Sequence, residues 1–255
     1  MSALAKAFAD RGGRPLLAGY LVAGDPDLAA SEAYMRALLD VVDVLEIGVP
    51  FSDPIADGPT IQAAAARALA KGAKPADALA LAARLRKASS KPMVAMTYYN
   101  PILRAGLDRF AADARAAGLD GVIVPDLPFE ESGPARRAFD AADLDLVQLA
   151  SPATPPARMA KLAEATRGFL YLVSGYGVTG ARGDLDPRVS DLVRTAKRAA
   201  GKTPVAVGFG VSKAEHVKTL AQAGADGVIV GSAFVSRVAE RVAPADLARF
   251  AASLR

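Results

Sequence analysis

Short runs of hydrophobic residues recur along the whole chain at fairly regular intervals. Nearly every position in these runs is apolar, without the alternation of polar and apolar residues that marks a strand with one solvent-exposed face. Such runs are typical of strands that are buried on both faces, as in a parallel sheet covered by helices. We therefore predict eight buried strands, at residues 16–22, 43–48, 92–98, 121–125, 145–149, 168–173, 203–208 and 227–231.

The segments between these runs have the pattern of amphipathic helices. Alanine-rich stretches at 75–88 and 212–223 space their apolar residues as a helix does, and Gly118 and Gly224 mark helix ends. Eight strands that alternate with helices predict a parallel sheet closed into a (β/α)8 barrel, the TIM-barrel fold. Because no linker or change of composition interrupts the pattern, we expect residues 1–255 to form a single domain.

The first 17 residues predict a short N-terminal helix with Leu4, Ala7 and Phe8 on one face, and not a signal peptide, because no long apolar stretch occurs there. No run approaches the roughly 18 apolar residues of a membrane-spanning helix. The chain has no cysteine, which excludes disulfides, thiolate metal sites and cysteine nucleophiles. The lack of cysteine also fits a reducing compartment, so we expect a cytoplasmic location.

The charge pattern gives no sign of a polyanionic partner. The formal net charge is only +4, and the basic residues are spread along the chain. The densest basic cluster, Arg194, Lys197 and Arg198, has the spacing of a solvated helix face. We therefore expect neither a nucleic acid nor a membrane as a partner.

The intervals between strands are widest after the second and the sixth strand. In a (β/α)8 barrel the loops that follow the strands build the catalytic face. Loops longer than the usual connection are often functional. We therefore expect extended loops after strands 2 and 6, and the chemistry beside them.

The segment after strand 2 holds two carboxylates that could act as an acid–base pair. Glu46 lies near the end of an apolar strand, where burial would raise its pKa, and Asp57 follows in a loop stiffened by prolines and glycines. Carboxylates in two different environments suit general acid and base work. The alternatives are a salt-bridged or outward-facing Glu46 and an ordinary Asp-Gly turn at Asp57.

The segment after strand 6, GYGVTG at 175–180, has the spacing G-x-G-x-x-G of a dinucleotide-binding turn. The context argues against that function, because the glycines do not open a helix directly and no acidic residue follows at a strand end. A closing loop with glycine hinges is the better interpretation. We expect no cofactor in this chain. We also expect no metal, since the only histidine, His216, lies inside a predicted helix.

Glycines at the ends of strands 7 and 8 suggest a phosphate site. Barrels often bind phosphate there, where backbone N–H groups and a helix N-terminus approach the anion. The alternative is that these glycines only allow tight turns. The candidate phosphate-binding residues are Gly208, Gly210, Gly231 and Ser232.

Several segments together resemble the tryptophan synthase α-subunit family. The longest is EIGVPFSDPIADGPTIQ at 46–62, and the others follow in family order over about residues 15–240: AGDPD, MTYYNP, VPDLPFEES, VSGYGVTG, GFGVS and VGSAFV. The resemblance implies a lyase that cleaves indole-3-glycerol phosphate to indole and glyceraldehyde 3-phosphate. It places the catalytic carboxylates at Glu46 and Asp57.

The resemblance also implies contacts for the substrate and for a protein partner. The partner is a β subunit that carries pyridoxal phosphate and completes an αββα heterotetramer. Because the long loops surround the barrel mouth, we expect the partner to dock there, with Pro50, Asp53 and Pro54 of loop 2 at the interface. The alternative is that these three residues only shape the loop. The implied substrate contacts fall mostly near strand ends, where a residue taken singly is more often part of the plain core. They are Tyr20, Ile61, Met96, Tyr98, Ile123, Tyr171, Thr179, Gly180, Phe209 and Ile229.

Two positions depart from many family members, which carry threonine where this chain has Val22 and arginine where it has Gly175. Neither departure touches the two carboxylates, although Gly175 removes any loop 6 contact that an arginine would make. Three other functions remain open at this level: a lyase that works without a partner, a sugar-phosphate isomerase, and a non-catalytic regulatory subunit.

Overall fold

The computed structural model describes residues 1–175, 185–208 and 210–255. Its strands form one closed parallel barrel in which each strand pairs with the next and the eighth pairs with the first. This confirms the predicted (β/α)8 fold. The strands are β1 Leu16–Val22, β2 Val44–Gly48, β3 Met93–Met96, β4 Gly121–Ile123, β5 Asp145–Ala150, β6 Leu170–Val173, β7 Val205–Gly208 and β8 Gly227–Val230.

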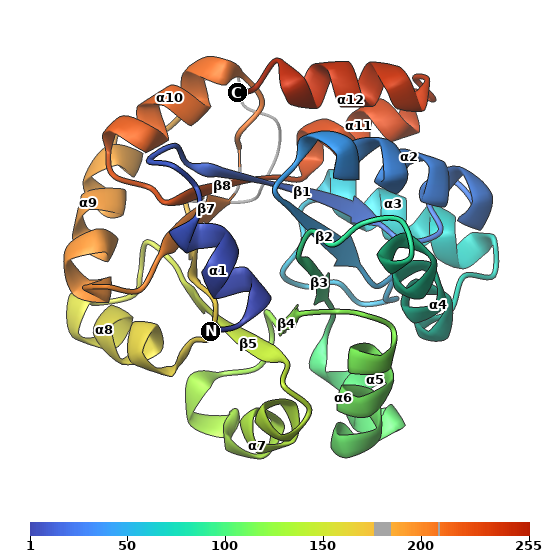
Figure 1. Ribbon diagram of the computed structural model, residues 1–255, viewed down its shortest axis with the longest axis horizontal. Coiled ribbons are helices and arrows are strands. Elements are labelled where there is room, and N and C mark those ends of the chain that lie inside the picture. The colour runs from blue at the N-terminus through green and yellow to red at the C-terminus, as the bar shows by residue number, and fades with distance from the viewer. Residues whose placement is uncertain (176–184, 209) are drawn as a thin grey trace.

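Helices surround the barrel as an outer ring (Figure 1). Their apolar faces pack on strands that are buried along almost their whole length, as the continuous hydrophobic runs require. The helices are α1 Ala3–Ala9, α2 Leu28–Val41, α3 Pro59–Ala70, α4 Pro75–Arg86, α5 Tyr99–Ala105, α6 Leu107–Ala116, α7 Gly133–Ala141, α8 Pro156–Ala165, α9 Val189–Ala200, α10 Ala214–Gln222, α11 Ser232–Ala239 and α12 Pro244–Ala252, with a short 3-10 turn at Phe129–Glu131. None of the helices in the described part of the chain is long and apolar enough to cross a membrane.

The wide interval after β2 is only partly a loop. Residues 49–58 form the loop, and two helices, α3 and α4, fill the remainder of the interval before β3. The extra length therefore comes largely from an added helix, which the alanine-rich sequence favours. After β6, residues 176–184 of the interval lie outside the described part of the chain.

Helix α1 closes the N-terminal end of the barrel, as Figure 1 shows. Leu4 and Phe8, two of the three residues predicted on its inner face, are buried. Glycines on the barrel make room for them: a Cβ on Gly121 would lie 3.0 Å from Leu4 Cδ1, and one on Gly227 would lie 3.1 Å from Phe8 Cε1. This end of the barrel is therefore filled with side chains.

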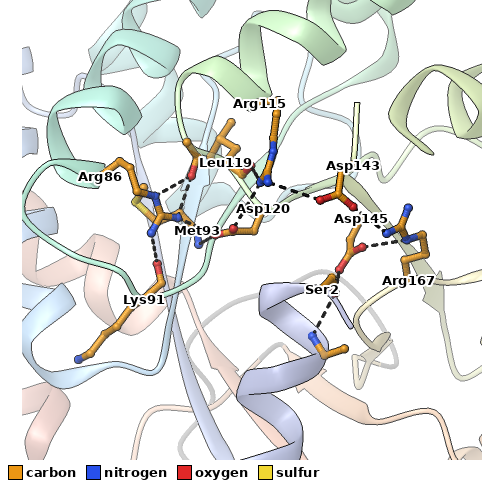
Figure 2. A network of polar contacts seen from close by, with 12 residues as sticks. Ser2, Arg86, Lys91, Met93, Arg115, Leu119, Asp120, Asp143, Asp145 and Arg167 are labelled. Atoms are coloured by element: carbon orange, nitrogen blue, oxygen red, sulfur yellow. Dashed lines mark hydrogen bonds and ion pairs between the residues drawn. The ribbon is translucent and has the colours of Figure 1, made fainter. Parts of the chain in front are cut away.

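Aspartates at the starts of strands tie this end of the barrel together (Figure 2). Asp120 accepts the Met93 N–H of the neighbouring strand at 2.9 Å and pairs with Arg86 at 2.6 Å. Asp145 accepts the hydroxyl of Ser2, the N-cap of α1, and pairs with Arg167 at 3.0 Å. The polar groups at this end hold the strands and α1 together. The active site of a (β/α)8 barrel lies at the opposite end, where the strands finish.

Candidate active site at the carboxyl end of the barrel

Glu46 points into the barrel from β2. It pairs in register with Tyr20 of β1 and Val94 of β3, and only 2% of it is exposed. Its Oε1 has no hydrogen-bond partner among the described residues. Burial, together with the nearby charge of Asp57, raises the pKa of Glu46 to about 8. The outward-facing or salt-bridged alternative is therefore wrong, and Glu46 holds a proton at neutral pH.

Asp57 is presented by the loop between β2 and α3. A turn closed by the Asp57 N–H on the Pro54 carbonyl at 3.0 Å shapes this loop, and Gly58 and Pro59 then begin α3. Burial raises the pKa of the Asp57 carboxyl to about 6, and a hydrogen bond from the Tyr98 hydroxyl at 2.9 Å opposes that rise. Asp57 is therefore mainly ionised at neutral pH, unlike Glu46.

A cavity brings the two carboxylates together with most of the predicted substrate and phosphate residues. The space beside Glu46 is about 30 Å³, and a larger space of about 700 Å³ adjoins it, since Asp57 and Met96 line both. The cavity around Glu46 is lined by Tyr20, Glu46, Asp57, Ile61, Met96, Tyr171, Gly210, Val211, Ser212, Ile229, Gly231, Ser232 and Ala233.

Three of these lining residues were not predicted from the sequence: Val211, Ser212 and Ala233. All three lie one or two residues after a predicted phosphate-binding position, Gly210 or Ser232, so extending the two phosphate motifs by a few residues would have found them. The larger adjoining space is lined mainly by residues that follow β4, such as Asp126 and Leu127, and by residues at the end of β5 and after it, such as Gln148 and Leu149. None of these four residues was among the predicted substrate contacts.

Several predicted residues lie outside the cavity around Glu46. Ile123 is fully buried in β4, and Tyr98 lies behind Asp57. Thr179, Gly180 and Phe209 are outside the described residues.

Two buried tyrosines, Tyr20 and Tyr171, line the cavity and explain two glycines at strand ends. A Cβ on Gly208 would lie 2.4 Å from the Tyr171 hydroxyl, and one on Gly48 would lie 2.2 Å from the Tyr20 hydroxyl. Burial and the nearby carboxylates raise the pKa of both tyrosine hydroxyls well above the usual range, so both hydroxyls keep their protons. Gly208 is therefore required by the close approach of Tyr171, and it does not line the cavity around Glu46.

The candidate phosphate site lies at the start of α11. Gly231 is the N-cap, and its carbonyl accepts the N–H groups of Phe234 at 2.8 Å and Val235 at 3.0 Å. The N–H groups of Ser232 and Ala233 thus begin the helix without an intrahelical acceptor. Both residues line the cavity, which gives it an anion-binding end.

Loop 2 also reaches the surface beside the cavity. Asp53 is exposed and Pro54 is half-buried, and the neighbouring Ile55 is 81% exposed. Pro50, by contrast, is buried, because it lies only two residues after the end of β2. Of the three predicted interface residues, only Asp53 and Pro54 present surface to a partner.

Nothing in the described part of the chain has the arrangement of a metal site, since no three histidine, cysteine or carboxylate residues cluster there. His216 is buried in α10, where its Nδ1 accepts the Ser212 N–H at 3.3 Å. The histidine is therefore a packing residue that also holds the chain after β7.

The sequence matches one known family and relatives that carry the same description. The profile of the family described as tryptophan synthase alpha chain matches residues 7–253. A tryptophan synthase alpha chain of Geobacter sulfurreducens is 47% identical over 252 residues, covering 98% of this chain and 94% of the relative. One from Arabidopsis thaliana is 45% identical over 233 residues, covering 91% and 84%.

A solved structure agrees with these sequences. A chain from the tryptophan synthase α2β2 complex of Pyrococcus furiosus superposes with a TM-score of 0.89 and 45% identity, covering 94% of this chain and 97% of that one. Both the sequence and the barrel geometry are thus shared over nearly the full length. The chain belongs to the tryptophan synthase α-chain family.

Proposed function

We propose that this chain cleaves indole-3-glycerol phosphate to indole and glyceraldehyde 3-phosphate, with Glu46 and Asp57 as its acid–base pair. The observation that carries the assignment of these residues is the cavity in which a protonated and an ionised carboxylate lie near a helix N-terminus. Release of indole from indole-3-glycerol phosphate by the purified chain tests the proposed activity.

Glu46 would act first as an acid and then as a base. Its raised pKa supplies a proton to ring carbon C3, which converts the indole into an indolenine. The Glu46 carboxylate then takes the proton of the glycerol hydroxyl beside the breaking bond. The electrons of the C–C bond return to the ring, so indole and the aldehyde leave and Glu46 is protonated again.

Asp57 would stabilise the charge that develops on the ring. Its carboxylate accepts a hydrogen bond from the indole N–H, which becomes more acidic as C3 is protonated. A negative group held in a partly buried site interacts more strongly with that positive charge than it would in water. The interaction is therefore greater in the transition state than in the bound substrate.

The phosphate would anchor the substrate at the start of α11. A Gly231→Asp substitution should weaken binding of glycerol 3-phosphate by at least ~10-fold, because it adds a negative charge beside the anion, while binding of indole changes little. Calorimetry with the two ligands measures both affinities. Gly231→Ala is the matched control, since a Cβ here would meet Tyr20 at an ordinary 3.4 Å. Equal weakening of both ligands by the aspartate would place the phosphate elsewhere.

The partner of this chain is a tryptophan synthase β subunit, as in the α2β2 complex of the Pyrococcus relative. Pyridoxal phosphate belongs, in this proposal, to the β subunit alone. A cytoplasmic location remains a prediction that rests on the reducing environment expected from the lack of cysteine. We place the docking surface on loop 2, where the exposed Asp53 and Ile55 lie beside the cavity mouth.

The Asp53→Ala variant tests directly whether the β subunit binds at loop 2. The variant should bind the β subunit several-fold more weakly and be activated less by it, because loop 2 contacts the partner and carries Asp57. Arg198→Ala on α9 is the control and should behave as wild type does. Titration of each variant with the β subunit, followed by indole release, gives affinity and activation together. If both variants match wild type, docking does not involve Asp53.

A further inference from the structure

Tyr98 is the hydrogen-bond partner of the Asp57 carboxylate. It follows β3 and is the N-cap of α5, and only 3% of the residue is exposed. Its ring stacks on Phe51 of loop 2, with centroids 5.2 Å apart and an interplanar angle of 26°. The tyrosine is therefore fixed against the loop that carries Asp57.

The Tyr98 hydroxyl makes two hydrogen bonds whose directions are determined. The Ala56 N–H can only donate, and it donates to the hydroxyl oxygen at 3.0 Å. The hydroxyl proton is then free to point at Asp57 Oδ2, which lies 2.9 Å away. Asp57 Oδ1 has no hydrogen-bond partner among the described residues. The two carboxylate oxygens thus have different surroundings.

We propose that Tyr98 is a positioning residue, whose hydroxyl holds Oδ2 of Asp57 in place and leaves Oδ1 for the ring N–H of the substrate. The proposal of a substrate N–H at Oδ1 rests on the proposed lyase function. The hold on Oδ2 rests only on the hydrogen bonds, the stacking and the burial of Tyr98. Tyr98 acts through Asp57 and touches no reacting atom.

This hydrogen bond also keeps Asp57 ionised. Burial raises the pKa of Asp57, whereas the hydroxyl donor lowers it. Among the described residues, the other titratable groups that interact with Asp57 are Glu46 from β2, Tyr20 from β1 and Tyr171 from β6. Glu46 and the tyrosines are neutral near pH 7, so none of them supplies the positive charge that could replace the donor. Asp126, which follows β4, adds negative charge beside Tyr98.

The test is Tyr98→Phe, which keeps the ring that stacks on Phe51 and removes only the hydroxyl. The pKa of Asp57 should rise by roughly one to two pH units, the size of a hydrogen bond to a charged group. Carbon-13 NMR of the labelled aspartate carboxyls measures that pKa without substrate, with Asp57→Asn used to identify the signal. The acidic limb of the kcat–pH profile should move up by the same amount, while KM changes less than about threefold.

Tyr34→Phe is the matched control, because it removes another hydroxyl of a buried tyrosine, which lies on α2 and donates to the Val242 carbonyl at 2.6 Å. It should leave the Asp57 titration and the pH profile unchanged. An unchanged Asp57 pKa in Tyr98→Phe, or a kcat lowered equally at all pH values, would overturn the proposal. If wild type releases no indole, the proposed function fails, yet the NMR titration still decides the role of Tyr98.

Discussion

Replacement of Glu46 by glutamine should lower the turnover of indole-3-glycerol phosphate by at least ~100-fold, in line with the loss of a general acid and base. Glutamine keeps the size of the side chain and can donate a hydrogen bond. It cannot deliver a proton to ring carbon C3 or take one from the glycerol hydroxyl. Steady-state release of indole at saturating substrate measures the effect, and turnover within a few-fold of wild type would refute the role of Glu46.

The pH dependence of the free energy of unfolding shows whether the Glu46→Gln variant folds as wild type does. The native pKa of Glu46, about 8, lies above its ordinary value of 4.5, so between these values the native state holds more protons than the unfolded state. The free energy of unfolding of wild type therefore falls as pH rises through this window. Glutamine has no such proton, so Glu46→Gln should gain stability relative to wild type, by on the order of a few kcal/mol near pH 8. Urea unfolding near pH 5 and pH 8 checks this.

Replacement of Asp57 by asparagine should also reduce kcat strongly, by about 100-fold or more, with a smaller change in substrate affinity. Asparagine retains an oxygen that can accept the indole N–H but removes the negative charge. Since that charge matters most after C3 has been protonated, the loss falls on the transition state. Comparison of kcat with the affinity for a non-cleavable substrate analogue separates the two effects. Weaker binding with unchanged kcat would contradict the assignment.

The eight strands could be predicted because their burial on both faces leaves continuous apolar runs. Their ends were less accurate: the run at 92–98 became β3 Met93–Met96, and 121–125 became β4 Gly121–Ile123. Strand ends depend on hydrogen bonds between neighbouring chains, which a single sequence does not display. Helix α3 was missed because its alanine-rich segment at 59–70 was counted as part of a long loop interval.

The two carboxylates could be predicted because one interrupts an apolar strand and the other lies in a loop stiffened by proline and glycine. The partner of Asp57 could not, since Tyr98 lies 41 positions away and meets it only when β2 and β3 are neighbours. The aspartates at the N-terminal end of the barrel were missed for the same reason. Asp120, for example, contacts Met93, 27 positions away. Contacts between residues on different strands can be identified only once the fold is known, whereas burial leaves a pattern of apolar residues in the sequence.

The most direct test of the account is to mix the purified chain with indole-3-glycerol phosphate and measure indole and glyceraldehyde 3-phosphate, with and without a β subunit. We expect the two products in equal amounts, and faster release when the β subunit is present. Product formation should depend on both Glu46 and Asp57. No indole under either condition, or undiminished release by the Glu46→Gln and Asp57→Asn variants, would contradict the central claim.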